Sequence, residues 1–170
     1  MTPSLATAII RDFEPEAAKS KSVLAAVPES KFDWKPHEKS MTLRELAAHV
    51  AEAPMWLHSM LEGDEMDFEG MEETYKPFAP KSHTELMEAH DANVKAFCEG
   101  LAGQEDEFLL RDWTMRKGEK ILMKSARTQI IREIMIHHVA HHRGQLTVYL
   151  RLLDVPVPAT YGPSADDNPF

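Results

Sequence analysis

The sequence predicts an all-α fold, a bundle of four helices, from three observations. Glycine is scarce, with 7 in 170 residues, whereas Ala, Leu, Met, Glu and Lys, which lose little rotamer freedom in helices, are abundant. Apolar residues recur at helical spacing over long stretches. Residues that cap or break helices divide those stretches into a few segments. The length fits one domain over residues 1–170, with enough chain to bury a core.

The first predicted helix covers residues 4–26. Pro28 and Pro36 interrupt the helical pattern after it. The apolar residues that should form its buried face are Ile9, Phe13, Ala17, Val23 and Leu24.

The second predicted helix begins at a clear signal. Thr42 is followed three residues later by Glu45, the spacing of a capping box in which each side chain accepts a hydrogen bond from the other residue's backbone N–H. The helix should continue to about Leu61 and stop at Gly63, with a kink at Pro54.

A surface loop and a third helix are expected next. Residues 64–81 are acidic and contain two prolines, which favours a loop. Ser82 or Thr84 can cap a helix that runs to about Leu101 and ends at Gly103.

A small β-hairpin is expected before the last helix. Residues 108–110 and 121–123 are short apolar runs, and Gly118 between them suits a turn that needs positive φ. Two strands alone are marginally stable, so the hairpin should lie against the helices.

The fourth and longest predicted helix covers residues 125–153, with Ser125 as its cap. The C-terminal tail should be irregular because it is rich in proline. Tyr161 suggests that the tail packs on the body of the protein. Its prolines are Pro156, Pro158, Pro163 and Pro169.

Charge and cysteine content exclude several classes of function. The formal net charge is -9, with 28 acidic against 19 basic residues, which disfavours nucleic acid and anionic membranes as partners. Cys98 is the single cysteine, so no intrachain disulfide can form and a reducing compartment is favoured. The N-terminus lacks the basic start and apolar run of a secretion signal, and no segment has the apolar length of a membrane span. We therefore expect a cytoplasmic protein.

Histidines dominate the candidate chemistry. His137, His138, His141 and His142 are four of the chain's 9 histidines and fall within the last predicted helix. Residues four apart share a helix face, so 138 pairs with 142 and 137 pairs with 141. Such imidazole pairs can chelate a borderline ion such as zinc, nickel or iron. Periodicity alone does not choose between the two pairs.

A third ligand is expected from elsewhere, and His49 is the best candidate. It shares a stripe of the second helix with Leu46, Ala53 and Trp56, where a polar side chain needs a partner. By itself, His49 fits a hydrogen-bonded core histidine better than a ligand. The dense cluster on the last helix shifts the balance towards metal binding. The remaining histidines are expected at the surface or in loops: His37, His58, His83 and His90.

Two familiar metal motifs are excluded. Residues 137–141 have the outline of the zinc-protease H-E-x-x-H motif, but His138 occupies the position of the essential glutamate. A di-iron bundle would need Glu-x-x-His pairs, and Glu133 precedes His137 by four residues rather than three.

Three segments resemble the DinB-like (DinB/YfiT-like) superfamily of helical proteins with a proposed metal dependence. Residues 142–146, which read HRGQL, with His138 four residues earlier, are similar to the terminal-helix motif of that family. Residues 46–50, which read LAAHV, resemble its second-helix motif. The tail at residues 153–164 also looks like that of family members.

The resemblance implies a four-helix bundle with a long crossover connection and a metal site formed by His49, His138 and His142. It implies one divalent ion, nickel or zinc, and a homodimer formed through the helices. Gly144 would permit close helix approach in such a dimer. Members of the family transfer or use low-molecular-weight thiols, or act as isomerases or hydrolases.

Two hypotheses of function follow. In the first, the chain is an enzyme whose three-histidine site acts on a small molecule by thiol transfer or hydrolysis, with the other coordination positions open. No catalytic acid or base is recognisable beyond the ligands, although Gln145, one turn after His142, can orient a ligand. In the second, the protein is a non-catalytic, stress-response metal binder, and His137 or His141 closes the site as a fourth ligand.

Overall fold

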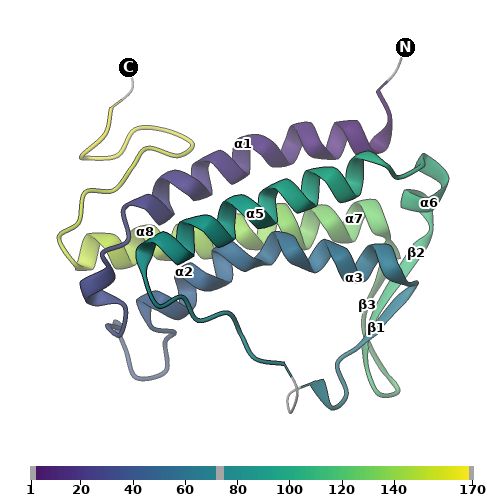
Figure 1. Cartoon of the computed structure of the whole chain (residues 1–170), viewed down its shortest axis with the longest axis horizontal. Helices are drawn as coiled ribbons and strands as arrows, with labels where there is room; N and C mark the ends of the chain where they lie inside the picture. The colour runs from purple at the N-terminus through teal and green to yellow at the C-terminus, as the bar shows by residue number, and fades with distance from the viewer. Residues whose placement is uncertain (1–2, 72–74, 169–170) are drawn as a thin grey trace.

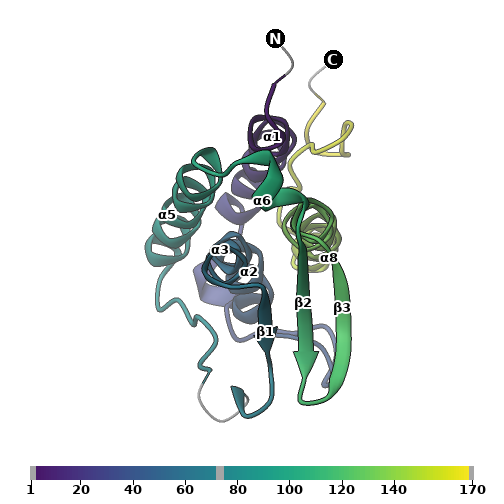
Figure 2. The ribbon, with the colours of Figure 1, turned by 90° about the vertical axis from the view of Figure 1, so that its right-hand side faces the viewer.

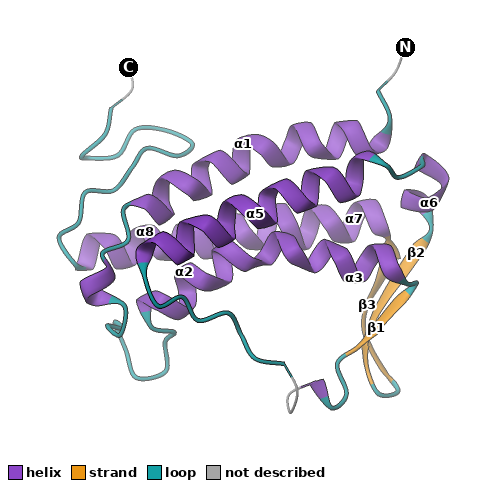
Figure 3. Ribbon diagram, viewed as in Figure 1, coloured by secondary structure: helices purple, strands orange, loops and turns teal. Residues whose placement is uncertain are grey.

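The computed structural model describes residues 3–71 and 75–168 and is mostly helical, with a small three-stranded sheet at one end (Figures 1 and 3). Helices α1 (Leu5–Ala25) and α2 (Leu43–Glu52) each pack against both α5 (His83–Ala102) and α8 (Val139–Leu152). Figure 2 looks along these helices and shows the strands extending away from them. No helix within the described ranges is both long and apolar enough to cross a membrane.

The first two helices begin where the sequence predicts. The Ser4 hydroxyl caps α1 by accepting a hydrogen bond from the Thr7 backbone N–H at 3.2 Å. A short 3-10 helix, η1 (Glu29–Lys31), follows it. The Thr42–Glu45 capping box is formed at the start of α2, with the Thr42 N–H donating to Glu45 Oε2 at 2.7 Å. The predicted face of α1 is buried throughout: Ile9, Phe13, Ala17, Val23 and Leu24.

The predicted interruption at Pro54 is a change of helix type. The chain passes from α2 through the 3-10 helix η2 (Ala53–Trp56) into α3 (Leu57–Glu62). Proline lacks the N–H that would continue the α-helical ladder, so the turn tightens there.

The Ser82 hydroxyl caps α5 and accepts from the Glu85 N–H at 3.1 Å. Gly103 ends that helix, as predicted.

The prediction of a strand at residues 108–110 is wrong. These residues lie in a short helix, α6 (Asp106–Leu110). A three-residue apolar run does not distinguish strand from helix, and here the tertiary contacts decide. Leu109 is fully buried while Leu110 is exposed, and the Asp106 carboxylate accepts from the Leu5 N–H at 2.8 Å.

The hairpin itself is present but belongs to a larger sheet. Strands β2 (Asp112–Lys117) and β3 (Lys120–Ala126) are antiparallel, and Gly118 in the turn has the expected positive φ, 57°. A third strand, β1 (Glu65–Asp67), pairs with β2 in parallel, so the prediction of a loop over all of residues 64–81 is wrong. Residues 72–74 of that segment lie outside the described ranges. Arg116 on β2 pairs with Glu65 at 2.8 Å and Asp67 at 2.5 Å. These ion pairs help to hold β1, which has three residues and a single apolar side chain.

A buried arginine fixes the sheet to the helices. Arg127 is fully buried, and its guanidinium donates to the carbonyls of Met60 at 2.9 Å and Gly63 at 2.8 Å. It also donates to the carbonyl of Asp112 at 3.2 Å and pairs with the Asp64 carboxylate. One side chain thus satisfies backbone acceptors from the end of α3 and the start of β2.

The last helical segment is less regular than predicted. Ser125 lies within β3 rather than at a helix cap, and the helix begins one residue after Ala126. The segment consists of α7 (Arg127–Ile131), the π-helix η3 (Arg132–His138) and α8. It ends near the predicted position, with Asp154 in the left-handed region at a φ of 56°.

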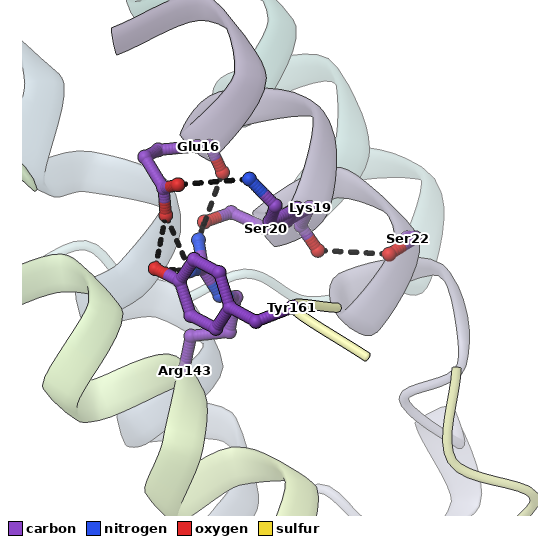
Figure 4. Close-up of polar contacts among 6 residues, drawn as sticks. All are labelled: Glu16, Lys19, Ser20, Ser22, Arg143 and Tyr161. Carbon is purple, nitrogen blue, oxygen red and sulfur yellow. Dashed lines mark hydrogen bonds and ion pairs between the residues drawn. The ribbon is translucent and has the colours of Figure 1, made fainter. Parts of the chain in front are cut away.

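The tail contacts the body through Tyr161 (Figure 4). Residues 155–168 contain neither helix nor strand, and Pro169 lies outside the described ranges. The Tyr161 hydroxyl donates to a carboxylate oxygen of Glu16 on α1 and accepts from Arg143 on α8. Tyr161 thus joins the tail to α1 and α8 through hydrogen bonds, although its side chain is largely exposed.

Arg143 is the centre of this contact between α1, α8 and the tail. Its side chain is buried between the helices and pairs with the Glu16 carboxylate. It also donates to the Glu16 carbonyl at 2.9 Å and to the Ser20 hydroxyl at 3.1 Å (Figure 4). Lys19 approaches the second oxygen of Glu16 at 2.9 Å. A buried guanidinium is costly unless its donors are paired, and these contacts pair them.

Glu16 is held in its charged form by these partners. Partial burial on its own raises the pKa of Glu16, but hydrogen bonds from Tyr161, Lys19 and Arg143 outweigh it and lower the pKa to about 2. A carboxylate whose pKa falls on folding adds stability above its unfolded pKa, and this stability is lost as the pH falls through the folded pKa.

We therefore predict that the advantage of wild type over Glu16→Gln depends on pH. The free energy of unfolding should favour wild type by on the order of 2 kcal/mol near pH 7. The difference should shrink as the pH falls below about 4.5 towards 2. Urea unfolding followed by circular dichroism at several pH values measures it. Glu14→Gln, which removes an exposed carboxylate from the same helix, is the control. Parallel pH profiles for wild type and Glu16→Gln would contradict the assignment.

Candidate metal centre

His49 extends from α2 towards the last helical segment. The capping box fixes where α2 starts, and the buried residues Leu46, Ala47 and Val50 fix its rotation against the core. His49 lies at the edge of that buried face, with 20% of its side chain exposed. Its ring is 5.2 Å from the Trp56 ring, centroid to centroid.

His138 and His142 reach the same point from the last helical segment. His138 is the final residue of η3, and His142 lies one turn later in α8. The centroids of their rings are 4.4 Å apart, and the His49 ring lies 4.6 Å from that of His142. The Nε2 atoms of His49 and His138 are 3.0 Å apart. One ring nitrogen from each of the three residues lies within 4.8 Å of the others, so this cluster could hold a metal ion.

The other histidine pair points to solvent. His137 and His141 are exposed, and neither belongs to the three-member cluster found among the described residues. The inward face of α8 is formed by Val139, Arg143 and Leu146, and His138 and His142 flank it. Packing thus distinguishes two pairs that periodicity alone left equivalent.

Burial keeps two of the clustered histidines neutral. Desolvation, and then the neighbouring rings of His142, His49 and His141, lower the pKa of His138 to about 4. Burial also lowers the pKa of His142, although its hydrogen bond to Gln145 opposes the shift. A metal binds the neutral form of imidazole, in which one of the two ring nitrogens carries a lone pair, and both rings favour this form at neutral pH.

Outer contacts orient the rings. His142 Nδ1 lies 2.8 Å from Gln145 Oε1, an acceptor, so the proton of this ring belongs on Nδ1 and its Nε2 lone pair is free. The amide nitrogen of Gln145 lies 3.1 Å from His141 Nε2 and can donate to it. On His49, Nε2 faces His138 while Nδ1 lies 3.8 Å from a carboxylate oxygen of Glu52.

The nitrogen spacing suits a single ion. Two nitrogens that bind one ion at about 2.1 Å lie about 3.0–3.4 Å apart. The His49–His138 pair already has a spacing of 3.0 Å, and every pair in the set is within 4.8 Å. Three neutral nitrogen donors are a ligand set that zinc and nickel accept.

Sequence reasoning misplaced one histidine and missed one carboxylate. His90, expected at the surface, is 2% exposed, and burial lowers its pKa; it contacts Asp91 at 3.3 Å. Glu52 is buried beside His49 and was not identified. Its position three residues after His49, on the same helix face, is the signal that could have found it.

Comparisons with known proteins match the chain along nearly its whole length. The model of the DinB family covers residues 1–168. An uncharacterized protein, YrdA, of Bacillus subtilis (strain 168) is 23% identical over 158 residues, which cover 93% of this chain and 89% of the relative.

Two crystal structures of DinB-like proteins share the fold. The protein from Bacillus cereus ATCC 10987 has a TM-score of 0.65 at 22% identity, with 86% of this chain and 91% of that chain covered. The protein YjoA from Bacillus subtilis has a TM-score of 0.64 at 18% identity, with 86% and 92% covered. With the family match over residues 1–168, the chain belongs to the DinB family.

Proposed function

We propose that the chain is a metal-dependent enzyme in which His49, His138 and His142 hold one divalent ion, nickel or zinc. The observation that carries the proposal is the convergence of three imidazole nitrogens within 4.8 Å from segments 89 residues apart in sequence. The lowered pKa of His138 and that of His142 support it, because protonated rings would repel a cation.

The loaded site would act on a small molecule by thiol transfer or hydrolysis. A divalent ion supplies Lewis acidity that favours the deprotonated form of a water or thiol near neutral pH. For thiol transfer, the co-substrate would be a low-molecular-weight thiol. The chain's own residues orient the reactants: Gln145 fixes the His142 ring, and Trp56 forms an apolar wall beside His49 and His138. The three histidines are only partly buried, which suits approach of a small molecule.

The alternative, a purely structural ion, needs a fourth ligand from the protein. The contacts of His141 argue against this role, because its ring is exposed and its Nε2 faces the Gln145 amide. His137 is exposed and lies outside the cluster. Three ligands with open positions therefore suit the observed contacts better than a closed site.

The arrangement of the helices extends the proposal. We propose that α1, α2–α3, α5 and the α7–α8 segment form a four-helix bundle, with residues 63–82 as its long crossover connection. We also propose a cytoplasmic location, because the single cysteine, Cys98, is free and suits a reducing compartment.

A metal-content measurement tests the site. Untagged wild-type protein incubated with zinc or nickel and desalted should carry one ion per chain by elemental analysis. His49→Ala, His138→Ala and His142→Ala should each lose most of the ion because each removes one of three donors. His137→Ala, an exposed histidine of the same helical segment, should keep it. Full metal content in the three ligand variants, or none in wild type, would refute the proposed centre.

We further propose a homodimer formed through α8. Gly144, Val148 and Leu152 follow one another at a spacing of four on the exposed face of α8, with Val148 56% and Leu152 57% exposed. A Cβ atom at Gly144 would meet nothing within 4 Å in the described part of the chain, which leaves room for a second helix.

We predict that Val148→Asp combined with Leu152→Asp converts a dimer into a monomer. Burying two carboxylates in an apolar helix contact is strongly unfavourable. Light scattering coupled to size-exclusion chromatography measures the mass. Ile121→Asp, at an equally exposed apolar position on β3, should leave the dimer intact. A wild-type monomer, or a double variant that stays dimeric, would rule out this interface.

A further inference from the structure

Glu52 carries a buried carboxylate next to the histidine cluster. It is the last residue of α2 and is 5% exposed. Two neutral groups donate to it: the Tyr75 hydroxyl to Oε1 at 3.1 Å and the Phe78 backbone N–H to Oε2 at 3.1 Å. Hydrogen bonds from neutral donors lower the free-energy cost of burying a carboxylate. A basic partner lowers this cost further.

His49 is the partner that the helix geometry offers. It lies three residues before Glu52 on the same face of α2, and its Nδ1 is 3.8 Å from Glu52 Oε1. Within the described ranges, His49 is the basic side chain that comes within 4 Å of this carboxylate. The imidazole ring therefore lies between two neighbours: Glu52 on its Nδ1 side and His138, 3.0 Å away, on its Nε2 side.

We propose that Glu52 is a positioning residue of the metal centre, accepting the Nδ1 proton of His49 while His49 Nε2 binds the ion. The inference rests on the proposed metal binding of the three histidines. A ring that ligates through Nε2 must carry its proton on Nδ1, and that proton then faces the carboxylate. Acceptors of this kind fix the orientation of a ligating histidine and make its nitrogen a stronger donor.

The distance of 3.8 Å is too long for a hydrogen bond, so the two groups face each other without one in this structure. An approach of about 1 Å between the His49 ring and the carboxylate would bring this contact into hydrogen-bond range. Oε1 can accept this proton without releasing Tyr75, because each carboxylate oxygen has two lone-pair sites.

The surroundings hold Glu52 in place for this role. Tyr75 and Phe78 bind it from the connection between β1 and α5. The Asn93 amide on α5 donates to the carbonyl of Ala51 at 3.0 Å, which ties the end of α2 to its neighbour. His142 has a neutral amide, Gln145, as its outer acceptor. Glu52 would thus be the negatively charged group that contacts a ligating histidine without binding the ion itself.

Metal affinity tests the inference. Zinc and nickel dissociation constants are measured by competition with a chromophoric chelator for wild type, Glu52→Gln and Glu52→Ala. We expect affinity to fall by about 10- to 100-fold in Glu52→Gln and at least as far in Glu52→Ala. The matched control is Glu62→Gln, because Glu62 pairs with His58 at 2.9 Å on the surface of α3, away from the cluster. Its affinity should equal that of wild type.

A purely structural role for Glu52 makes a different prediction. Tyr75→Phe removes one of the hydrogen bonds between Glu52 and residues 75–78 but keeps the carboxylate charge. If Glu52 only anchored those residues, this variant would lower the metal affinity as Glu52→Gln does. We expect the metal affinity of Tyr75→Phe to be close to that of wild type. Nitrogen-15 NMR of the histidine rings supplies a readout that needs no variant: the zinc-loaded wild type should show a hydrogen-bonded Nδ1 proton on His49.

The outcomes separate the two proposals. A wild type that binds no ion would refute the proposed function itself. A wild type that binds, with Glu52→Gln and Glu52→Ala binding equally well, would refute the role of Glu52 and leave the three-histidine centre intact. If the Glu52 variants do not fold, a His49 ring protonated on Nε2, or lacking a hydrogen-bonded Nδ1 proton, in the zinc-loaded wild type would overturn the inference.

Discussion

The buried guanidinium of Arg143 is the constraint on which the geometry of the histidine cluster depends. Arg143 directly follows His142 in α8, and in the described part of the chain its donors pair with groups on α1 and with Tyr161 of the tail. Turning α8 about its axis would strip those donors of partners inside the protein, which is strongly unfavourable. With Arg143 fixed towards α1, the adjacent His142 and the preceding His138 must face α2, where His49 lies.

The cluster therefore combines two kinds of control. Hydrophobic packing sets the distance between α2 and α8, since Leu46, Val50 and Leu146 belong to one buried cluster. Polar contacts set rotation: Arg143 fixes the rotation of the helix, and Gln145 fixes that of the His142 ring. The rings themselves pack edge to face, with His49 and His142 at an interplanar angle of 88°. A site of this kind is largely formed before any ligand arrives.

Much of the fold could be predicted from local chemistry, because capping is encoded within a few residues. Thr42 and Ser82 each accept a backbone hydrogen bond expected of a helix cap, and α2 and α5 start where these residues predict. The strand β1 could not be predicted, because it has three residues and depends on ion pairs with Arg116, 51 residues away. Residues 108–110 illustrate the same limit, since a short apolar run takes its conformation from the surface it contacts.

The three histidines that lie together could be named from the sequence, but the packing that brings them together could not. The choice of His138 and His142 over the neighbouring pair came from resemblance. The helical pattern did not make this choice, because Arg143 is a charged residue on the buried face. A charged residue looks like a surface position in a sequence pattern, yet Arg143 is 1% exposed. The π-helical turns of η3 further shift the phase between residues 127–131 and 139–152, so a single helical period does not describe the whole segment.

The position of Trp56 gives the protein a built-in optical reporter. Its indole ring lies 5.2 Å from the His49 ring and 6.1 Å from the His138 ring, in direct contact with the cluster. A paramagnetic nickel ion in the cluster would quench the fluorescence of this indole, whereas zinc, with its filled d shell, would leave the emission largely intact. The two metals could thus be told apart in solution by the light that the protein itself emits.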